Sequence, residues 1–187
     1  FNEVGWFYCS ADSTAIDRYV TYNYVEQSWA IGQLERTAWL DEGIVAFPRA
    51  TGKDSSTPYL YQHETGNDND GSPMDNVYIE SADFDIGDGE QFQFIRRMIP
   101  DVKFTGSGGT SQQINVVLKQ RNFPGDSLST DQTTSFTSST TKIDMRARAR
   151  QAALRFESDD DAAVGIREGV GFRVGATRLD LQPNGRR

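Results

Sequence analysis

Short strand-like segments joined by polar turns dominate the first forty residues, and they restrict the chain to folds built from β-sheets. The segment 18–24, RYVTYNY, alternates two kinds of side chain with the period of two of a strand that has two different faces. A polar turn follows at Glu26 and Gln27, and Trp29 then opens the next strand. Strand, turn and Trp in this order are typical of the inner hairpin of a β-propeller blade, where the indole fills the gap between neighbouring blades.

The remainder of the chain also predicts strands and no helix of useful length. The segment 145–150, MRARAR, alternates Met and Ala with Arg, so it predicts a strand. The Gly-Asp-Gly turn at 87–89 predicts a hairpin between the strands on either side. We expect an all-β protein, in which a partial β-propeller-like blade region is followed by a β-sandwich-like antiparallel region.

The segment 63–75, HETGNDNDGSPMD, is dense in Gly, Asn and Asp and predicts the boundary between the two regions. We place the blade-like region at residues 1–64 and the sandwich-like region at residues 65–187. The chain starts with Phe1 in an apolar strand, without an initiator Met, a signal peptide or a membrane span. We therefore expect the blade-like region to continue a longer upstream chain.

Charge is distributed unevenly along the 187 residues, whose net charge is -8. Residues 1–90 hold 4 Lys and Arg against 17 Asp and Glu, whereas residues 91–187 hold 15 against 10. These parts can be two solvated surfaces of unlike charge, or they can meet in contacts between an acidic and a basic surface. The single cysteine, Cys9, excludes an intrachain disulfide, and its strand context predicts a small buried side chain.

Catalytic motifs are missing from the sequence. The single histidine, His63, cannot form a multi-His zinc site, and we expect it to pack or to form a hydrogen bond. Phosphate-binding and dinucleotide-binding glycine loops do not occur. The carboxylate pair Asp83 and Asp85 could suggest a glycosidase, but it is interpreted as the exposed face of a strand with Phe84 and Ile86 inward. We expect no enzyme and no cofactor.

Three aspartates are candidate ligands for a calcium-like cation. Asp68, Asp70 and Asp75 surround Gly71, and hard cations bind several oxygen ligands from a short loop. The loop lacks the terminal Glu of an EF-hand. The alternative is a solvated acidic turn.

Arg146, Arg148 and Arg150 form the strongest electrostatic motif of the chain. On a strand, side chains two residues apart point to one face, about 7 Å from each other. Like charges in a row repel, so carboxylates, water or phosphates must surround them. We expect a charge stripe or a subunit interface, paired with Asp or Glu within the chain or in a neighbouring subunit. A surface that faces DNA is the alternative.

Three segments are distinctive in their order and spacing: HETGNDNDGSPMDNVYIESADFDIGDG, RRMIPDVKF and FRVGATRLDLQPNGRR. Together they resemble the C-terminal part of the tail nozzle or hub proteins of short-tailed bacteriophages, which are also called packaged-DNA stabilisation proteins. The resemblance extends over nearly the whole chain.

The resemblance implies a structural protein of the virion tail, assembled in the host cytoplasm. Such proteins form rings, usually hexameric, that extend the head-to-tail channel, retain the packaged DNA and let it pass on infection. The implied partners are further copies of the chain, the adaptor and other tail proteins, and double-stranded DNA that passes without sequence reading. The alternative is a carbohydrate-binding or adhesion module, which an exposed platform of Trp or Tyr would favour and burial of Trp6, Trp29 and Trp39 would oppose.

Overall fold

The computed structural model describes residues 2–54, 56–69, 72–74, 76–105, 112–158 and 171–186. Within these ranges the chain forms strands, turns and loops and no helix, so the predicted all-β class is confirmed. Every strand pair in the described part is antiparallel, and no sheet there closes on itself. No described segment is a helix that could cross a membrane. The chain divides into two compact units, Phe1–Thr65 and Gly66–Arg187.

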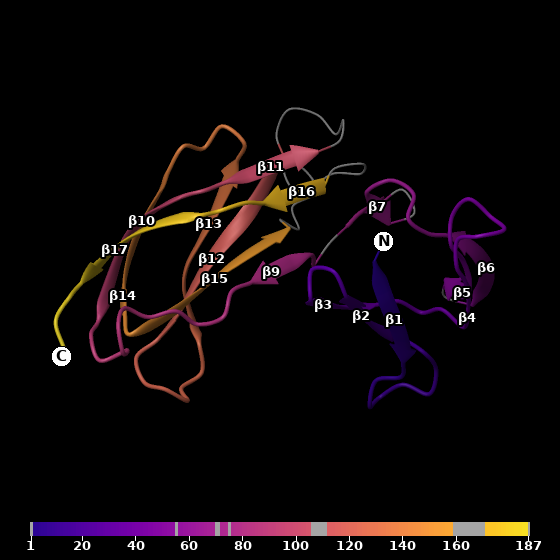
Figure 1. The fold of residues 1–187 in the computed structure, drawn as a ribbon, viewed down its shortest axis with the longest axis horizontal. Coiled ribbons are helices and arrows are strands. Elements are labelled where there is room, and N and C mark those ends of the chain that lie inside the picture. The colour runs from indigo at the N-terminus through magenta and orange to yellow at the C-terminus, as the bar shows by residue number, and fades with distance from the viewer. Residues whose placement is uncertain are drawn as a thin grey trace. The chain divides into compact units, whose positions relative to one another are not determined.

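Unit 1, Phe1–Thr65, contains two three-stranded sheets that follow one another along the chain (Figure 1). The first consists, in spatial order, of β1 (Glu3–Tyr8), β2 (Arg18–Asn23) and β3 (Ser28–Gln33). The second consists of β4 (Ala38–Leu40), β5 (Arg49–Asp54) and β6 (Thr57–Gln62). The predicted period-two segment at 18–24 is therefore a central strand, because β2 pairs with β1 on one side and with β3 on the other.

Within its described residues, unit 2, Gly66–Arg187, holds the remaining strands in four sheets (Figure 1). The largest has the order β13 (Ser129–Thr137), β12 (Gln113–Arg121), β15 (Gln151–Ser158) and β9 (Tyr78–Glu80). A three-stranded sheet has the order β14 (Ile143–Ala149), β10 (Gln93–Ile99) and β17 (Arg178–Pro183). Two pairs complete the unit, β11 (Val102–Thr105) with β16 (Gly171–Val174) and β7 (Asp68–Asn69) with β8 (Ser72–Pro73).

The core of unit 2 lies between its two large sheets. Ile95 and Met98 of β10 contribute to the same buried cluster as Leu118 of β12. Strand β14 shows how the sequence builds this core, since its residues are alternately buried and exposed. Met145, Ala147 and the other odd positions are buried, as the sequence predicts. The apolar positions of β14 therefore place its arginines on the outer face.

A β-bulge interrupts this alternation in β10. The register of β10 shifts between Ile95 and Arg97 against both of its neighbours. As a result Ile95 and Met98 are buried, whereas both Arg96 and Arg97 are exposed. Two consecutive arginines thus lie on the same outer face as those of β14.

Two local predictions are wrong. The turn at 87–89 exists, with positive φ at Gly87 (66°) and Gly89 (74°), but it does not close a hairpin. The flanking strand β9 pairs with β15, whereas β10 pairs with β14 and β17. Cys9 is exposed instead of buried, because it follows the end of β1 and has no sheet neighbour.

Candidate interaction surfaces

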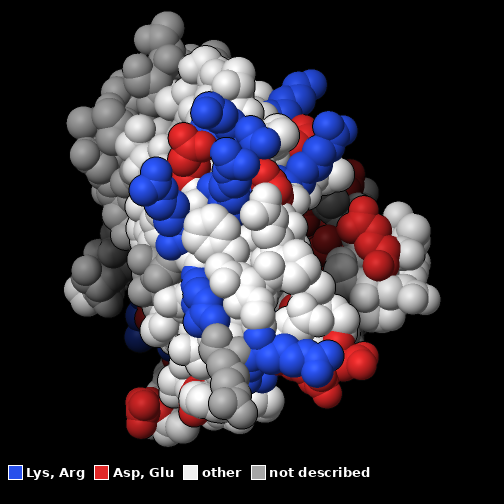
Figure 2. All heavy atoms as spheres, turned by 90° about the vertical axis from the view of Figure 1, so that its left-hand side faces the viewer, with Lys and Arg blue, Asp and Glu red and all other residues white. Residues whose placement is uncertain are grey.

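The outer face of the β14-β10-β17 sheet is strongly basic. We define this arginine face by Arg96, Arg97, Arg146, Arg148, Arg150 and Arg178. Cross-strand pairing brings Arg97 opposite Asp144 and Asp180, and brings Arg148 opposite Phe94. Figure 2 shows Lys and Arg side chains gathered on this side of the molecule, with a few acidic side chains between them.

Two arginines of the predicted stripe are held by an aromatic ring and by backbone carbonyls. The guanidinium carbon of Arg148 lies 3.9 Å from the centre of the Phe92 ring, and that of Arg150 lies 4.9 Å from it. Arg148 donates to the carbonyl oxygen of Asn184 at 3.2 Å. Arg150 donates to the carbonyl oxygens of Glu90 and Arg186. These contacts fix the orientation of both guanidinium groups without neutralising their charge.

The predicted role of Arg146, Arg148 and Arg150 as a subunit interface stays a prediction. Arg146 and Arg148 are exposed on one side of β14, as predicted, whereas Arg150 follows the end of the strand and is half-buried. Sequence reasoning missed Arg96, Arg97 and Arg178 as parts of the same surface. The pair Arg96-Arg97 inside an apolar strand is the signal that could have indicated a bulge.

The acidic and basic parts of the sequence meet within one unit. The change of charge near residue 90 falls inside unit 2, and ion pairs cross it there. Glu80 accepts a hydrogen bond from Nζ of Lys119 at 2.6 Å and lies 3.6 Å from Nη1 of Arg155. Asp83 forms an ion pair with Arg121. The two parts of the sequence are therefore not two separate surfaces.

The carboxylates considered for glycosidase chemistry are engaged in structural contacts. Asp83 pairs with Arg121, and Asp85 accepts a hydrogen bond from Nε2 of Gln151 at 3.3 Å. Phe84 between them packs against the core of unit 2, as predicted. This arrangement is that of a strand-like segment that pairs with β15 through Phe84 and Ala152.

The predicted cation loop lies largely outside the described residues. Asp70 and Asp75 are not among them, and only the backbone of Asp68, in β7, is described. The cation site therefore stays a prediction. Within the described ranges no group of three or more His, Cys, Asp and Glu residues could hold a metal ion.

A second surface, in unit 1, is apolar. Cross-strand partners share a face of a sheet, so the registers place Val4, Trp6, Val20, Tyr22, Trp29 and Ile31 on one face of the β1-β2-β3 sheet. We call it the aromatic face. Trp6 is 48% exposed, Trp29 is 64% exposed and Ile31 is 70% exposed. The Trp6 and Trp29 rings stack with centroids 6.1 Å apart, and the Tyr22 ring lies 4.5 Å from that of Trp29.

The opposite face of this sheet packs against the second sheet of unit 1. The Phe7 ring of β1 lies 5.2 Å from the Trp39 ring of β4, and Trp39 lies 4.6 Å from the His63 ring. Ala50 of β5 is buried on the same side of its sheet as Trp39. The β1-β2-β3 sheet therefore has aromatic residues on both faces, of which the Phe7 face is partly covered and the aromatic face is exposed.

Arg36 and His63 meet beside this covered interface. Nε of Arg36 donates to Nε2 of His63 at 3.0 Å, and the guanidinium lies 3.7 Å from the centre of the Tyr61 ring. Burial lowers the pKa of His63 below its ordinary value, and the positive charge of Arg36 lowers it further. The predicted hydrogen-bonding role of His63 agrees with this contact.

The lowered pKa of His63 predicts a pH-dependent stability of unit 1. Folding favours the neutral ring, so this stabilisation is complete above the ordinary pKa of 6.5 and is lost as pH falls through the lowered pKa. His63→Gln keeps an acceptor for Arg36 but does not titrate in this range. We expect its melting temperature, followed by Trp fluorescence, to fall less than that of the unmodified protein between about pH 7.5 and about pH 5.5. Equal decreases in both proteins would contradict the assignment.

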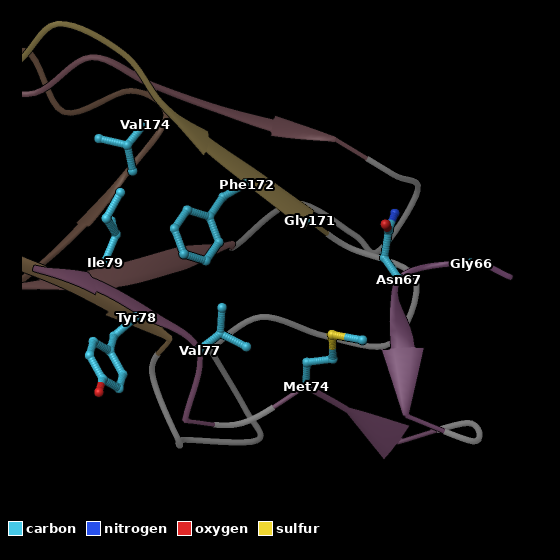
Figure 3. Close-up of a pocket in the computed structure, with 9 residues that line it drawn as sticks. All are labelled: Gly66, Asn67, Met74, Val77, Tyr78, Ile79, Gly171, Phe172 and Val174. Atoms are coloured by element: carbon cyan, nitrogen blue, oxygen red, sulfur yellow. The ribbon is translucent and has the colours of Figure 1, made fainter. Parts of the chain in front are cut away.

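An apolar pocket of about 380 Å³ lies in unit 2, between β9 and β16. In Figure 3, Phe172 and Val174 of β16 point toward Val77 and Ile79, whereas the Tyr78 ring points away. The Tyr78 ring instead lies 3.7 Å from the guanidinium carbon of Arg155. The described lining residues are almost entirely aliphatic and aromatic apart from Asn67, and among those that point into the pocket none is an acid or a base.

A comparison with models of known protein families gives no match to this chain, and neither does a comparison with curated proteins.

Proposed function

We propose that this chain is a structural protein of a bacteriophage tail, a nozzle or hub subunit with no catalytic role. Its copies form a ring, most simply a hexamer, that extends the head-to-tail DNA channel below the adaptor, retains packaged DNA and lets it pass on infection. The sequence resemblance supports this proposal, as do an all-β chain and a large apolar surface in need of a partner.

The proposal includes a finer interpretation of the fold. The two sheets of unit 1 follow one another in sequence and are in contact through the Phe7 and Trp39 rings, and we interpret them as consecutive blades of a propeller. In unit 2, the sheets that contain β10 and β12 share one apolar core, which is the principle of a β-sandwich.

The exposed aromatic face is the observation that carries the proposal. Large contiguous apolar patches on a protein surface mark contacts with another protein. Trp29 and Ile31 are far more exposed than the aromatic residues on the covered face of the same sheet. Ring assembly gives each copy two different contact surfaces, and we assign the aromatic face to one of them. If a preceding blade of the expected upstream chain covers this face instead, Ile31→Glu will lower the stability of unit 1 and leave the ring intact.

Mass photometry near physiological salt, with particle symmetry from electron microscopy, tests this proposal. We expect a ring, and we expect Ile31→Glu to dissociate it because a carboxylate would be buried in the contact. Ile44→Glu is the matched control, since Ile44 is 98% exposed in the loop between β4 and β5 and is not part of the aromatic face. A protein that remains monomeric in isolation and in tails, or a ring that tolerates Ile31→Glu, would contradict the assignment.

The exposure of Trp6 and Trp29 also favours a second candidate, a carbohydrate-binding or adhesion module. Stacked aromatic rings on a flat sheet can pack against sugar rings, and Arg18 and Gln33 lie across from Tyr8 at the end of the same face as possible hydrogen-bond donors. A glycan array, followed by titration of Trp fluorescence, tests this function. Saturable quenching by an oligosaccharide that Trp29→Ala abolishes would support it, and an unchanged signal with all glycans would exclude it.

A further inference from the structure

The arginine face carries positive charge in excess of the carboxylates beside it. Asp180 already pairs with Arg97, whose Nε lies 3.1 Å away, and Asp144 lies 3.7 Å from Nζ of Lys142. Arg96, Arg146 and Arg178 are exposed and form no ion pair with any residue in the described ranges. A face of this kind attracts a polyanion.

The type of cation and its support suit an anion with paired oxygens, such as phosphate or carboxylate. Several arginines on one face that form no ion pair within the described residues favour the repeated phosphates of a polyanion. A guanidinium group binds phosphate through two parallel hydrogen bonds, which lysine cannot do. The face lies on a paired sheet, and the bulge in β10 directs Arg96 and Arg97 to the same side as Arg146. Phe92 and the backbone carbonyls hold Arg148 and Arg150 at one end of the face. Binding therefore costs little conformational entropy at these two side chains, because they are already ordered.

We propose that the arginine face binds the phosphate backbone of double-stranded DNA without reading its sequence. The described residues form no helix that could enter the major groove, so base readout by a recognition helix has no support. Single strands bind through aromatic rings open to stacking, whereas Phe92 has Arg148 over it and Phe94, opposite Arg148 in the sheet, is half-buried. The inference goes beyond the ring function and does not depend on it, because a passive channel needs no such contact.

Fluorescence anisotropy with a labelled duplex of mixed sequence tests the proposal on the full chain, over salt concentrations from about 50 to about 200 mM. If the three excess arginines contact phosphates, the logarithm of the association constant should fall with the logarithm of the salt concentration with a slope of about -3. Arg96→Gln combined with Arg146→Gln should reduce the slope by about 2 and weaken binding by roughly one to two orders of magnitude at the low-salt end. Both positions are exposed, so the fold should be retained. Arg178→Gln provides an independent test, because it should also reduce the slope.

The matched control is Arg49→Gln combined with Lys53→Gln, which removes the same charge from exposed positions of β5. It should leave the slope and the affinity unchanged. Three results would overturn the proposal: no binding at about 50 mM salt, an affinity that does not fall as salt rises, or an equal loss of affinity in the control variant. Tighter binding of a single strand of equal length would overturn the choice of duplex. Self-association that is lost in the Arg96 and Arg146 variant, without DNA binding, would assign the face to carboxylates of a second copy instead.

Discussion

Leu118→Ala is expected to destabilise unit 2 by about 2–5 kcal/mol. Leu118 is 0% exposed and belongs to the cluster between the two large sheets, with Ile95 and Met145. Removing its three outer carbons loses transfer free energy and leaves a cavity that paired strands on both sides of β12 cannot close. Calorimetry or urea unfolding followed by circular dichroism measures the loss.

Leu60→Ala is the control for this substitution, because Leu60 is 66% exposed on β6. It should change the free energy of unfolding by less than about 0.5 kcal/mol. Similar losses for the two variants would mean that Leu118 does not lie in a tightly packed core.

Gly52→Ala is expected to destabilise unit 1 by about 1–3 kcal/mol, the usual range for an overpacked site. A Cβ atom at Gly52 would lie 2.5 Å from the carbonyl oxygen of Glu35 and 3.0 Å from Nη1 of Arg36. The first of these contacts is with backbone, so the chain before β4 has to move. That movement disturbs Arg36, which donates to His63.

Trp fluorescence is suited to this measurement, because Trp6, Trp29 and Trp39 all lie in unit 1. Gly43→Ala is the matched control, since a Cβ atom there meets no atom within 4 Å. An unchanged unfolding midpoint in Gly52→Ala would show that the segment around Glu35 adjusts without strain.

Tertiary contacts decided the surfaces on which the functional proposals rest. Trp6 and Trp29 show the hydrophobicity of core residues, yet they are exposed because only the Phe7 face of their sheet is covered within unit 1. The arginine face required the bulge in β10 and the pairing of β10 with β17, which is separated from it by most of the second half of the chain. The Arg96-Arg97 pair is a local signal for the bulge, but no local signal predicts the pairing of β10 with β17 or the exposed face of the β1-β2-β3 sheet.

The sequence alone determined the all-β class, the strand at residues 145–149 and the placement of Arg146 and Arg148 on one of its faces, because the period of two is a local property of each segment. It did not determine which strands pair. The turn at 87–89 was predictable from its glycines, but the strands beside it enter different sheets, since β9 pairs with β15 and β10 pairs with β14. Strand pairing is decided by burial of side chains far apart in sequence, which only the tertiary structure shows.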